Sequence, residues 1–440
     1  MTEKKISGLT AIAIVVANMI GTGIFTSLGF QVIDIHTDFS LLALWLIGGL
    51  AALCGALCYA ELAAALPRLG GEYNFLSRIF HPAVGFMAGF VSASVGFSAP
   101  IALAAIAFGT YFNALAPWTS PIALSLILVW VVTAILLFGF RAGSMFQDTA
   151  TVLKIGLILV LIVAGLTIGM KQPFSLVPTS SDLPTLFSAP FAKDLVFVMY
   201  AYSGWNAATY ITSEVRNAEK NVPLALMVGT IIVTVLYVLL NAVFLLSTPK
   251  QELAGQLKIG VISGANIFGP VGVGFTSGLV SFGLIASVSA MSWIGSRVTK
   301  AMADDFPRIS FFGRSNRQGI PHVALIFQSL IVTVLILTAS FEIVLLYVQF
   351  TLLACSFLAV LGLIILRIRE PELKRPYRVW LFPVTPLVFL GLTFWMMSFE
   401  FVQKPLASTL GLGTVLLGLV IYLLVRKGAT NSSSHAPGAA

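Results

Sequence analysis

The chain has 440 residues, of which 58% are hydrophobic and only 10% are charged. Soluble domains carry roughly 25% charged residues, so a soluble fold could not bury this much apolar surface. The formal net charge of +8 could suit a nucleic-acid-binding protein. The basic residues, however, are scattered over short loops and form no continuous stripe. We therefore expect an integral membrane protein that does not bind nucleic acid.

Apolar runs of about twenty residues recur along the whole chain, which is the length a helix needs to cross ~30 Å of hydrocarbon. The runs are rich in Ala, Leu, Ile and Val and do not alternate with polar residues, so they predict helices and not barrel strands. Twelve spans are predicted, at about 8–33, 41–66, 83–113, 121–139, 143–169, 188–214, 223–247, 265–303, 321–339, 342–367, 379–400 and 406–425.

The lysines and arginines are distributed unevenly between the two sets of loops. With the N-terminus inside, nineteen of the 25 basic residues lie in cytoplasmic segments and one, Lys154, lies within a span. The opposite loops hold only Lys171, Lys193, Lys250, Lys258 and Lys404. Since cytoplasmic loops carry the excess of basic residues, both termini are predicted to be cytoplasmic in a protein of the cell membrane. The tail at 428–440 is predicted to be disordered.

The first span contains a glycine-rich sequence, Ile20-Gly21-Thr22-Gly23. Glycine is roughly 1 kcal/mol poorer than alanine in a helix, so the helix is weakened here. Within a membrane, an interrupted helix is tolerated only where its backbone lines a cavity. The freed N–H groups would suit a carboxylate. Taken alone, a glycine-mediated contact between helices explains these residues equally well.

The sixth span contains a second potential helix interruption. At the centre of its apolar run lie Tyr200, Ser203, Gly204 and Trp205. An opening here would present backbone carbonyls to an ammonium group. The two interruptions fall in the first and sixth spans, which open successive five-helix units. Paired interruptions of this kind indicate a substrate site between inverted repeats. The pattern predicts a site for a zwitterion.

Lys154 lies eleven residues into the fifth span, hence about 16 Å deep at 1.5 Å per residue. Placing a lysine at that depth in the membrane costs at least ~2.5–3.5 kcal/mol of free energy, which favours a functional role for the residue over a purely structural one. Our hypothesis is that its ammonium joins helix one to helix eight in place of a bound cation. Glu61 and Glu214, near span ends, are expected to pair with loop arginines.

Metal-binding, catalytic and channel functions find little support in the sequence. The cysteines lie inside apolar runs and the four histidines show no ligand spacing, so we expect neither a metal nor a cofactor. We find no His/Asp/Glu or Ser/His cluster near an interface, which argues against an enzyme. Filter motifs and pore-lining rings are also missing, which argues against a channel.

Several motifs resemble those of the amino acid–polyamine–organocation superfamily. They are Ile-Gly-Thr-Gly-Ile-Phe at 20–25, Gly-Ala-Leu-Cys-Tyr-Ala-Glu-Leu at 55–62 and Pro-Arg-Leu-Gly-Gly-Glu-Tyr at 67–73. Ala-Tyr-Ser-Gly-Trp-Asn at 201–206, followed by the segment 212–225, is more specific. It resembles the L-type amino acid transporters, which include the light subunits of heteromeric transporters and their bacterial relatives.

The resemblance implies a leucine-transporter-like fold with helices 1 and 6 unwound at mid-membrane. Two inverted repeats would occupy 1–170 and 188–367, with helices 11 and 12 at 379–427. It also implies sodium-independent exchange of L-amino acids, and we expect neutral, small substrates. A proton-coupled symporter, or a transporter of cationic amino acids or polyamines, is the alternative. No acidic residue is clearly placed mid-membrane to receive a cationic side chain.

The resemblance further implies roles for particular residues. The amides of Thr22 and Gly23 would hold the substrate carboxylate, and carbonyls of Met19, Tyr200 and Ser203 would hold the amine. The complete expected substrate site is Met19, Ile20, Gly21, Thr22, Gly23, Tyr200, Ala201, Ser203 and Trp205. Lys154 matches a lysine that replaces a sodium site, Tyr237 a tyrosine that supports it, and Ser289 a polar position of span eight.

Two departures from the family pattern matter. Ser203 stands where many relatives have glycine, which would shrink the pocket. The loop at 113–120 has no cysteine, so the disulfide that ties family light chains to a heavy glycoprotein cannot form there. We therefore expect a stand-alone transporter whose partners are its substrate and the lipid bilayer.

Overall fold

The computed structural model describes residues 5–138, 142–169, 172–338 and 340–426, with 142–151 described as backbone only. The predicted tail at 428–440 lies outside these ranges. The regular elements of the described residues are all helical, and one isolated β-bridge joins Ile6 to Val215. The all-α fold class predicted from the apolar runs is confirmed.

Eight helical segments of the described chain are long and apolar enough to cross a membrane. These are α1 (Gly8–Met19) with α2 (Gly23–Asp34), α3 (Asp38–Ala65), α5 (Pro82–Val91) with a π-helical turn η1 (Ser92–Gly96) and α6 (Ser98–Asn113), α11 (Ala218–Ser247), α14 (Pro270–Asp305), α16 (Phe341–Arg369), α17 (Val384–Gln403) and α18 (Pro405–Val425).

The remaining helices are shorter or make connections. The more apolar of these are α7 (Pro121–Leu137), α8 (Ala142–Thr167), α10 (Ala189–Ala201), α13 (Ile259–Phe268) and α15 (His322–Thr338). The others are α4 (Glu72–Ile79), α9 (Asp182–Leu186), α12 (Lys250–Leu253) and the 3-10 helices η2 (Ala207–Glu214) and η3 (Pro307–Gly313).

Helix starts follow local capping chemistry. Thr37, Ser120, Ser188 and Ser340 precede α3, α7, α10 and α16, and each side chain accepts a hydrogen bond from a backbone N–H of the first turn. This satisfies a donor that the helix itself leaves unpaired. Proline lies in the first turn of α7, α10, α14 and α18, where it is suitable because it lacks the N–H group that would have no partner within the helix.

Every predicted span contains helix, but the span expected at 265–303 differs from the structure. The chain turns at Gly269, whose φ is 68°, and Pro270 begins α14 in a new direction. The residues before the turn form the separate helix α13, which packs back against α14. An apolar run that continues through a Gly-Pro turn concealed this reversal, because hydrophobicity carries no information about chain direction.

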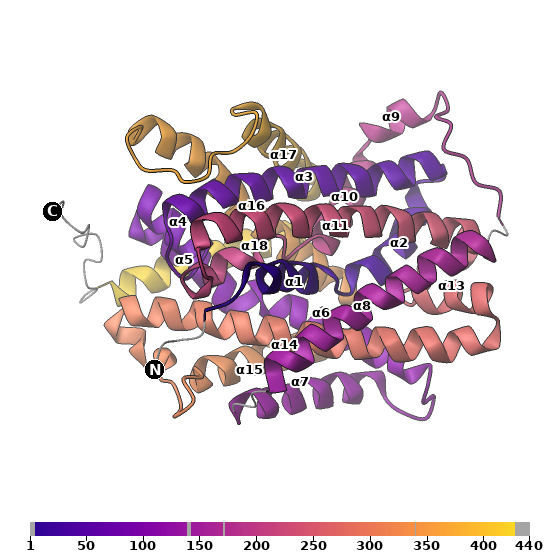
Figure 1. The fold of residues 1–440 in the computed structure, drawn as a ribbon, viewed down its shortest axis with the longest axis horizontal. Helices are drawn as coiled ribbons and strands as arrows, with labels where there is room; N and C mark the ends of the chain where they lie inside the picture. The colour runs from indigo at the N-terminus through magenta and orange to yellow at the C-terminus, as the bar shows by residue number, and fades with distance from the viewer. Residues whose placement is uncertain (1–4, 139–141, 170–171, 339, 427–440) are drawn as a thin grey trace.

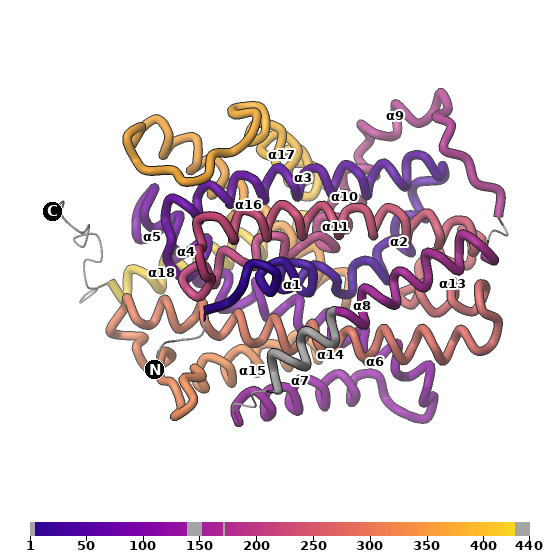
Figure 2. Tube along the Cα trace, in the orientation of Figure 1, coloured from indigo at the N-terminus to yellow at the C-terminus, as the bar shows by residue number. Residues whose placement is uncertain are grey.

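The helices form one bundle in which distant parts of the chain interleave. α1 lies between α11 and α14, and α3 packs along α11 (Figures 1 and 2). α10 packs against α2 and α3, so the two chain segments with expected interruptions lie in the same core. The connecting helix α4 lies toward the left end of the bundle in Figure 1 and α9 at the right end.

Candidate functional site

Two helices of the core are interrupted. α1 ends at Met19 and α2 begins at Gly23, so Ile20, Gly21 and Thr22 lie between the two helices. α10 ends at Ala201, and the chain turns through residues 202–206 before η2 begins. Within this turn Gly204 has a φ of 97°, a backbone conformation that side chains other than glycine rarely adopt. Both interruptions are surrounded by protein and leave backbone polar groups available to other partners.

The two interruptions touch each other directly. A Cβ added to Gly23 would lie 2.4 Å from the Cα atom of Ala201. A Cβ added to Gly204 would lie 2.9 Å from the carbonyl carbon of Asn18. The Thr22 and Tyr200 hydroxyls are 2.8 Å apart and share a hydrogen bond. The glycines are therefore required by close approach of two backbones.

Tyr237 of α11 joins the same two helix ends. Its hydroxyl lies 2.6 Å from the carbonyl oxygen of Met19 and 3.2 Å from that of Ala201. Both carbonyls belong to last helical residues, whose oxygens have no partner within their own helix. The tyrosine ring is fully buried and packs edge-on against Trp45, with ring centroids 5.7 Å apart. Tyr237 thus fixes where the two helices stop.

Lys154 of α8 lies on the other side of the first interruption. Its ammonium donates to the carbonyl oxygen of Ile20 at 2.9 Å and to that of Ala17 at 3.4 Å. A third hydrogen bond, 2.7 Å long, joins it to the Ser287 hydroxyl of α14. The ammonium therefore connects the first interrupted helix to α14, with carbonyl and hydroxyl oxygens around it as a hard cation would have.

The hydroxyl of α14 that contacts Lys154 is that of Ser287. Ser289, which the family resemblance places at the polar position of span eight, does not make this contact. Ser287 also donates to the Ile20 carbonyl oxygen at 3.3 Å. Ser289 lies half-buried two residues further along α14. Since residues two apart on a helix point to nearly opposite sides, only the rotation of α14 decides which serine meets Lys154.

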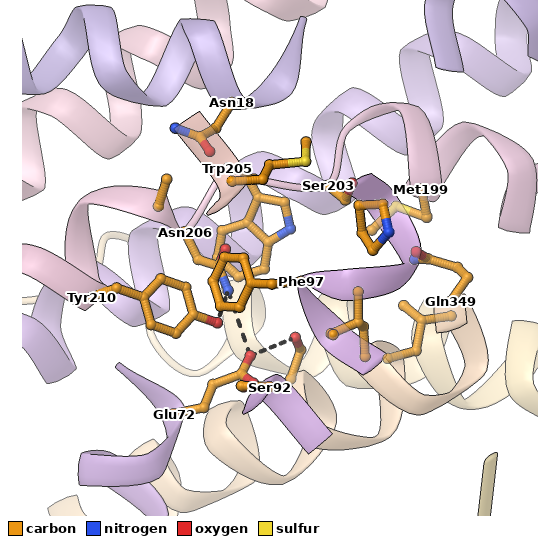
Figure 3. Close-up of a pocket in the computed structure, with 18 of the residues that line it drawn as sticks. Asn18, Glu72, Ser92, Phe97, Met199, Ser203, Trp205, Asn206, Tyr210 and Gln349 are labelled. Atoms are coloured by element: carbon orange, nitrogen blue, oxygen red, sulfur yellow. Dashed lines mark hydrogen bonds between the residues drawn. The ribbon is translucent and has the colours of Figure 1, made fainter. Parts of the chain in front are cut away.

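A cavity opens beside the second interruption. Ser203 and Trp205 line it, and Asn18 and Met199 contribute from the two helix ends (Figure 3). The remaining expected substrate residues do not line this cavity. They are Met19, Ile20, Gly21, Thr22, Gly23, Tyr200 and Ala201. Ile20 and Gly21 instead line a second cavity, of about 220 Å³, together with Lys154.

Seven polar residues of the large cavity were not expected as site residues: Asn18, Glu72, Ser92, Asn206, Tyr210, Gln349 and Ser356. Glu72 and Asn206 each lie inside a family-like motif, which is the signal that could have marked them. Gln349 and Ser356 sit within an ordinary apolar run. Their role in the wall depends on how α16 packs against the rest of the bundle.

Glu72 is the acidic residue of the cavity, and it is 1% exposed. One carboxylate oxygen accepts from the Tyr59 hydroxyl at 2.5 Å and from the Ser356 hydroxyl at 3.0 Å. The same oxygen accepts from the Asn206 amide at 3.5 Å (Figure 3). The other oxygen has no hydrogen-bond partner among the described residues. Burial raises the pKa of the Glu72 carboxyl, and the hydroxyls of Tyr59 and Ser356 oppose that rise.

Ion pairs hold the end of the bundle at which α4 lies. Glu61 pairs with Arg367 at 2.5 Å and with Arg375 at 3.3 Å, which confirms its expected partnership with loop arginines. Glu214 pairs with Arg297 at 3.5 Å, so its partner is an arginine, but one within α14 and not in a loop. Among the described residues, no group of three or more His, Cys, Asp or Glu is placed to hold a metal ion.

Comparison with known proteins identifies the family of the chain. A family model described as amino acid permease matches residues 6–424. The chain is 28% identical to the Asc-type amino acid transporter 1 of Mus musculus, over 96% of this chain and 81% of the mouse protein. It is 27% identical to the large neutral amino acids transporter small subunit 2 of Mus musculus, over 96% and 81%. The b(0,+)-type amino acid transporter 1 of Mus musculus is 26% identical, over 96% and 88%.

The many apolar helices and the family match define a multi-pass membrane protein. The chain belongs to the amino acid permease family, within the amino acid–polyamine–organocation superfamily. It is a transporter of amino acids and not an enzyme.

Proposed function

We propose that the protein is a sodium-independent exchanger of small, neutral L-amino acids. It would work by alternating access in the cell membrane, with both termini cytoplasmic. The proposed architecture has twelve spans. Two repeats, at 1–170 and 188–367, are related to each other by inversion, and the segment 379–427 adds two further helices. The shorter helices α7, α8, α10 and α15 coincide with the four predicted spans that the eight long segments leave over, which is consistent with twelve crossings. We propose a stand-alone subunit.

One observation supports transport without sodium: the ammonium of Lys154 lies between the Ile20 carbonyl and the Ser287 hydroxyl. A sodium ion would need several such oxygen ligands at the same place. The lysine already satisfies these groups and brings a positive charge when protonated. A second cation there would meet electrostatic repulsion in a medium of low dielectric constant. This argues that transport needs no sodium ion at this position.

Substrate recognition is proposed at the contact between the two interruptions. The amides of Thr22 and Gly23 lie at the start of α2, where the helix dipole favours a carboxylate. Carbonyls at the end of α10, such as that of Tyr200, would accept from the substrate ammonium. The Thr22–Tyr200 hydrogen bond would have to open to admit the substrate, which suits Tyr200 to act as a lid. Ser203 would restrict the side chain to a small one.

Reconstitution in liposomes tests this function. Vesicles are preloaded with alanine, serine, lysine or no amino acid, and uptake of radiolabelled alanine is measured with and without sodium. Uptake is expected only with internal alanine or serine, and to the same extent in potassium. Uptake into empty vesicles would contradict exchange, and a sodium requirement would contradict the proposed role of Lys154.

A pH gradient distinguishes the proton-coupled alternative. Alanine uptake is compared with the external pH lowered and the internal pH held constant. An exchanger of neutral amino acids moves no net charge or proton, so its rate should not follow the gradient. Uptake that is driven by the gradient in vesicles without internal substrate would establish symport instead.

A further inference from the structure

Glu72 presents an unusual combination of burial and charge. It is 1% exposed, yet none of the ion pairs formed between described residues includes it. Three neutral donors gather on one of its oxygens, while the other oxygen is left without a partner. Buried carboxylates are normally paired or coordinate a cation, because an isolated buried charge is costly. A cation bound in the cavity would supply the missing partner.

The surroundings of Glu72 suit an organic cation. Trp205, Tyr210 and Phe97 line the same cavity (Figure 3). The Trp205 ring packs against Tyr59 with centroids 4.7 Å apart, and the Tyr210 ring packs against Phe97 at 5.4 Å. The faces of aromatic rings attract an ammonium group, and a carboxylate completes its coordination.

Glu72 is also connected to the second helix interruption. The Asn206 amide that donates to Glu72 belongs to the turn that contains Ser203 and Gly204. The same amide donates to the Tyr210 hydroxyl at 3.4 Å. A ligand at Glu72 would thus sit against the chain segment that bears the proposed substrate site, at the opposite end of the same cavity from Met199 (Figure 3).

We propose that Glu72, together with the rings of Trp205 and Tyr210, forms a second site in the cavity that binds a primary ammonium group. This site holds the amino group of the transported amino acid on the side of the membrane where α4 lies, before or after the substrate occupies the helix interruptions. The inference rests on the proposed exchange of amino acids and adds an intermediate position to its path.

Propylammonium is a suitable probe, because it lacks the carboxylate that the first interruption would bind. Alanine exchange is measured in vesicles with propylammonium chloride on both sides, and matched potassium chloride serves as the control. The wild-type protein is expected to be inhibited. Exchange that proceeds normally but shows no inhibition beyond that by potassium chloride overturns the ammonium site and leaves the proposed exchange intact. Failure of exchange itself overturns both.

The variant Glu72→Gln keeps the length of the side chain and removes its charge. Its inhibition constant for propylammonium is expected to rise at least about tenfold, because a charge-assisted hydrogen bond is lost. Glu72→Asp retains the charge and should retain most of the inhibition. Glu342→Gln, at an exposed ion pair, is the matched control and should behave as the wild type. An unchanged inhibition constant in Glu72→Gln overturns the proposal.

A pH series on the wild type gives a test that needs no variant. Primary alkylamines stay protonated well above pH 8, so only the protein titrates. The titratable groups facing Glu72 are Tyr59 of α3, Tyr210 of η2 and Cys355 of α16. All three are neutral at pH 7 and below. Protonation of Glu72 should therefore weaken inhibition as the pH falls, and inhibition that stays constant down to about pH 4.5 overturns the proposal.

The same series separates an ammonium site from a site for a proton alone. A residue that only carries protons would make alanine uptake follow a pH gradient, and Glu72→Gln would abolish that dependence. Propylammonium would then inhibit wild type and variant equally. That pair of results overturns the ammonium site in favour of a proton site.

Discussion

The Gly23 Cα atom and the Ala201 backbone lie so close that no side chain fits between them. A Cβ at position 23 would come within 2.4 Å of the Ala201 Cα atom and 3.1 Å of its backbone nitrogen. The obstacle is main chain, which cannot rotate away as a flexible side chain could. The contact therefore couples the start of α2 to the end of α10, and any change that separates them alters both interruptions together.

Gly23→Ala is accordingly expected to abolish most alanine exchange. Overpacking of this kind costs typically about 1–3 kcal/mol, and here it would displace the proposed carboxylate site. Initial exchange rates in vesicles should fall at least about tenfold, with the protein still folded by size-exclusion chromatography. Gly156→Ala on α8 is the matched control, since an added Cβ there meets nothing within 4 Å. Equal rates for the two variants would contradict the required close approach.

Lys154→Met is expected to stop sodium-independent exchange. The substitution keeps an apolar stem of similar length and removes the ammonium from the Ile20 and Ala17 carbonyls. The Ala17 carbonyl would lose this donor, and the Ile20 carbonyl would keep only the longer contact with the Ser287 hydroxyl. An unsatisfied buried acceptor costs about 1–3 kcal/mol, so the rate should fall at least about tenfold.

Lys250→Met provides the comparison for Lys154. Lys250 pairs with Asp38 at 2.7 Å in a partly exposed place far from the interruptions in sequence. Its substitution should leave exchange within about twofold of the wild type, because surface ion pairs contribute little. Normal exchange by Lys154→Met would show that the ammonium is structural and has no part in transport.

Tyr237→Phe removes one hydroxyl that serves two helix ends. The carbonyls of Met19 and Ala201 would lose their shared donor, while the ring would still fill its place in the core. We expect a maximal rate lower by about tenfold, and a loss of stability of about 1–3 kcal/mol because buried acceptors are left unsatisfied. Tyr347→Phe loses a hydroxyl contact of 2.6 Å to Thr414 in a different part of the bundle and should exchange normally. Exchange by Tyr237→Phe at the wild-type rate would show that the hydroxyl has no part in transport.

Glu61→Gln should destabilise the protein rather than alter its substrate preference. The change leaves Arg367 and Arg375 without their carboxylate, and removing one member of a buried pair costs about 3–5 kcal/mol. The apparent Tm in detergent should fall by several degrees. Glu342→Gln breaks an exposed pair of 3.3 Å with Lys404 and should cost no more than about 1 kcal/mol. A similar Tm for both variants would show that the Glu61 pair contributes no more than a surface pair.

Much of the fold was predictable because it depends on neighbouring residues. Hydrophobic runs of membrane length, Ser and Thr caps and first-turn prolines mark where helices such as α3 and α10 begin. Gly21, Gly23 and Gly204 weaken helices wherever they occur, so the places of interruption could be expected. The α13–α14 reversal was missed, because a turn within a continuous apolar run leaves no break in hydrophobicity.

What the sequence determined by itself is local: which segments are helical, where two of them are weak, and that Lys154 lies deep in a span. The tertiary structure alone decided which groups meet. Rotation of α14 selected Ser287 over Ser289 for the lysine, and packing of α4, α16 and the turn after α10 placed Glu72, Ser356 and Asn206 around one cavity. These residues are far apart in the chain, and the physical reason is general: helix propensity acts over a few neighbours, whereas a cavity wall depends on the rotation and docking of every helix that borders it.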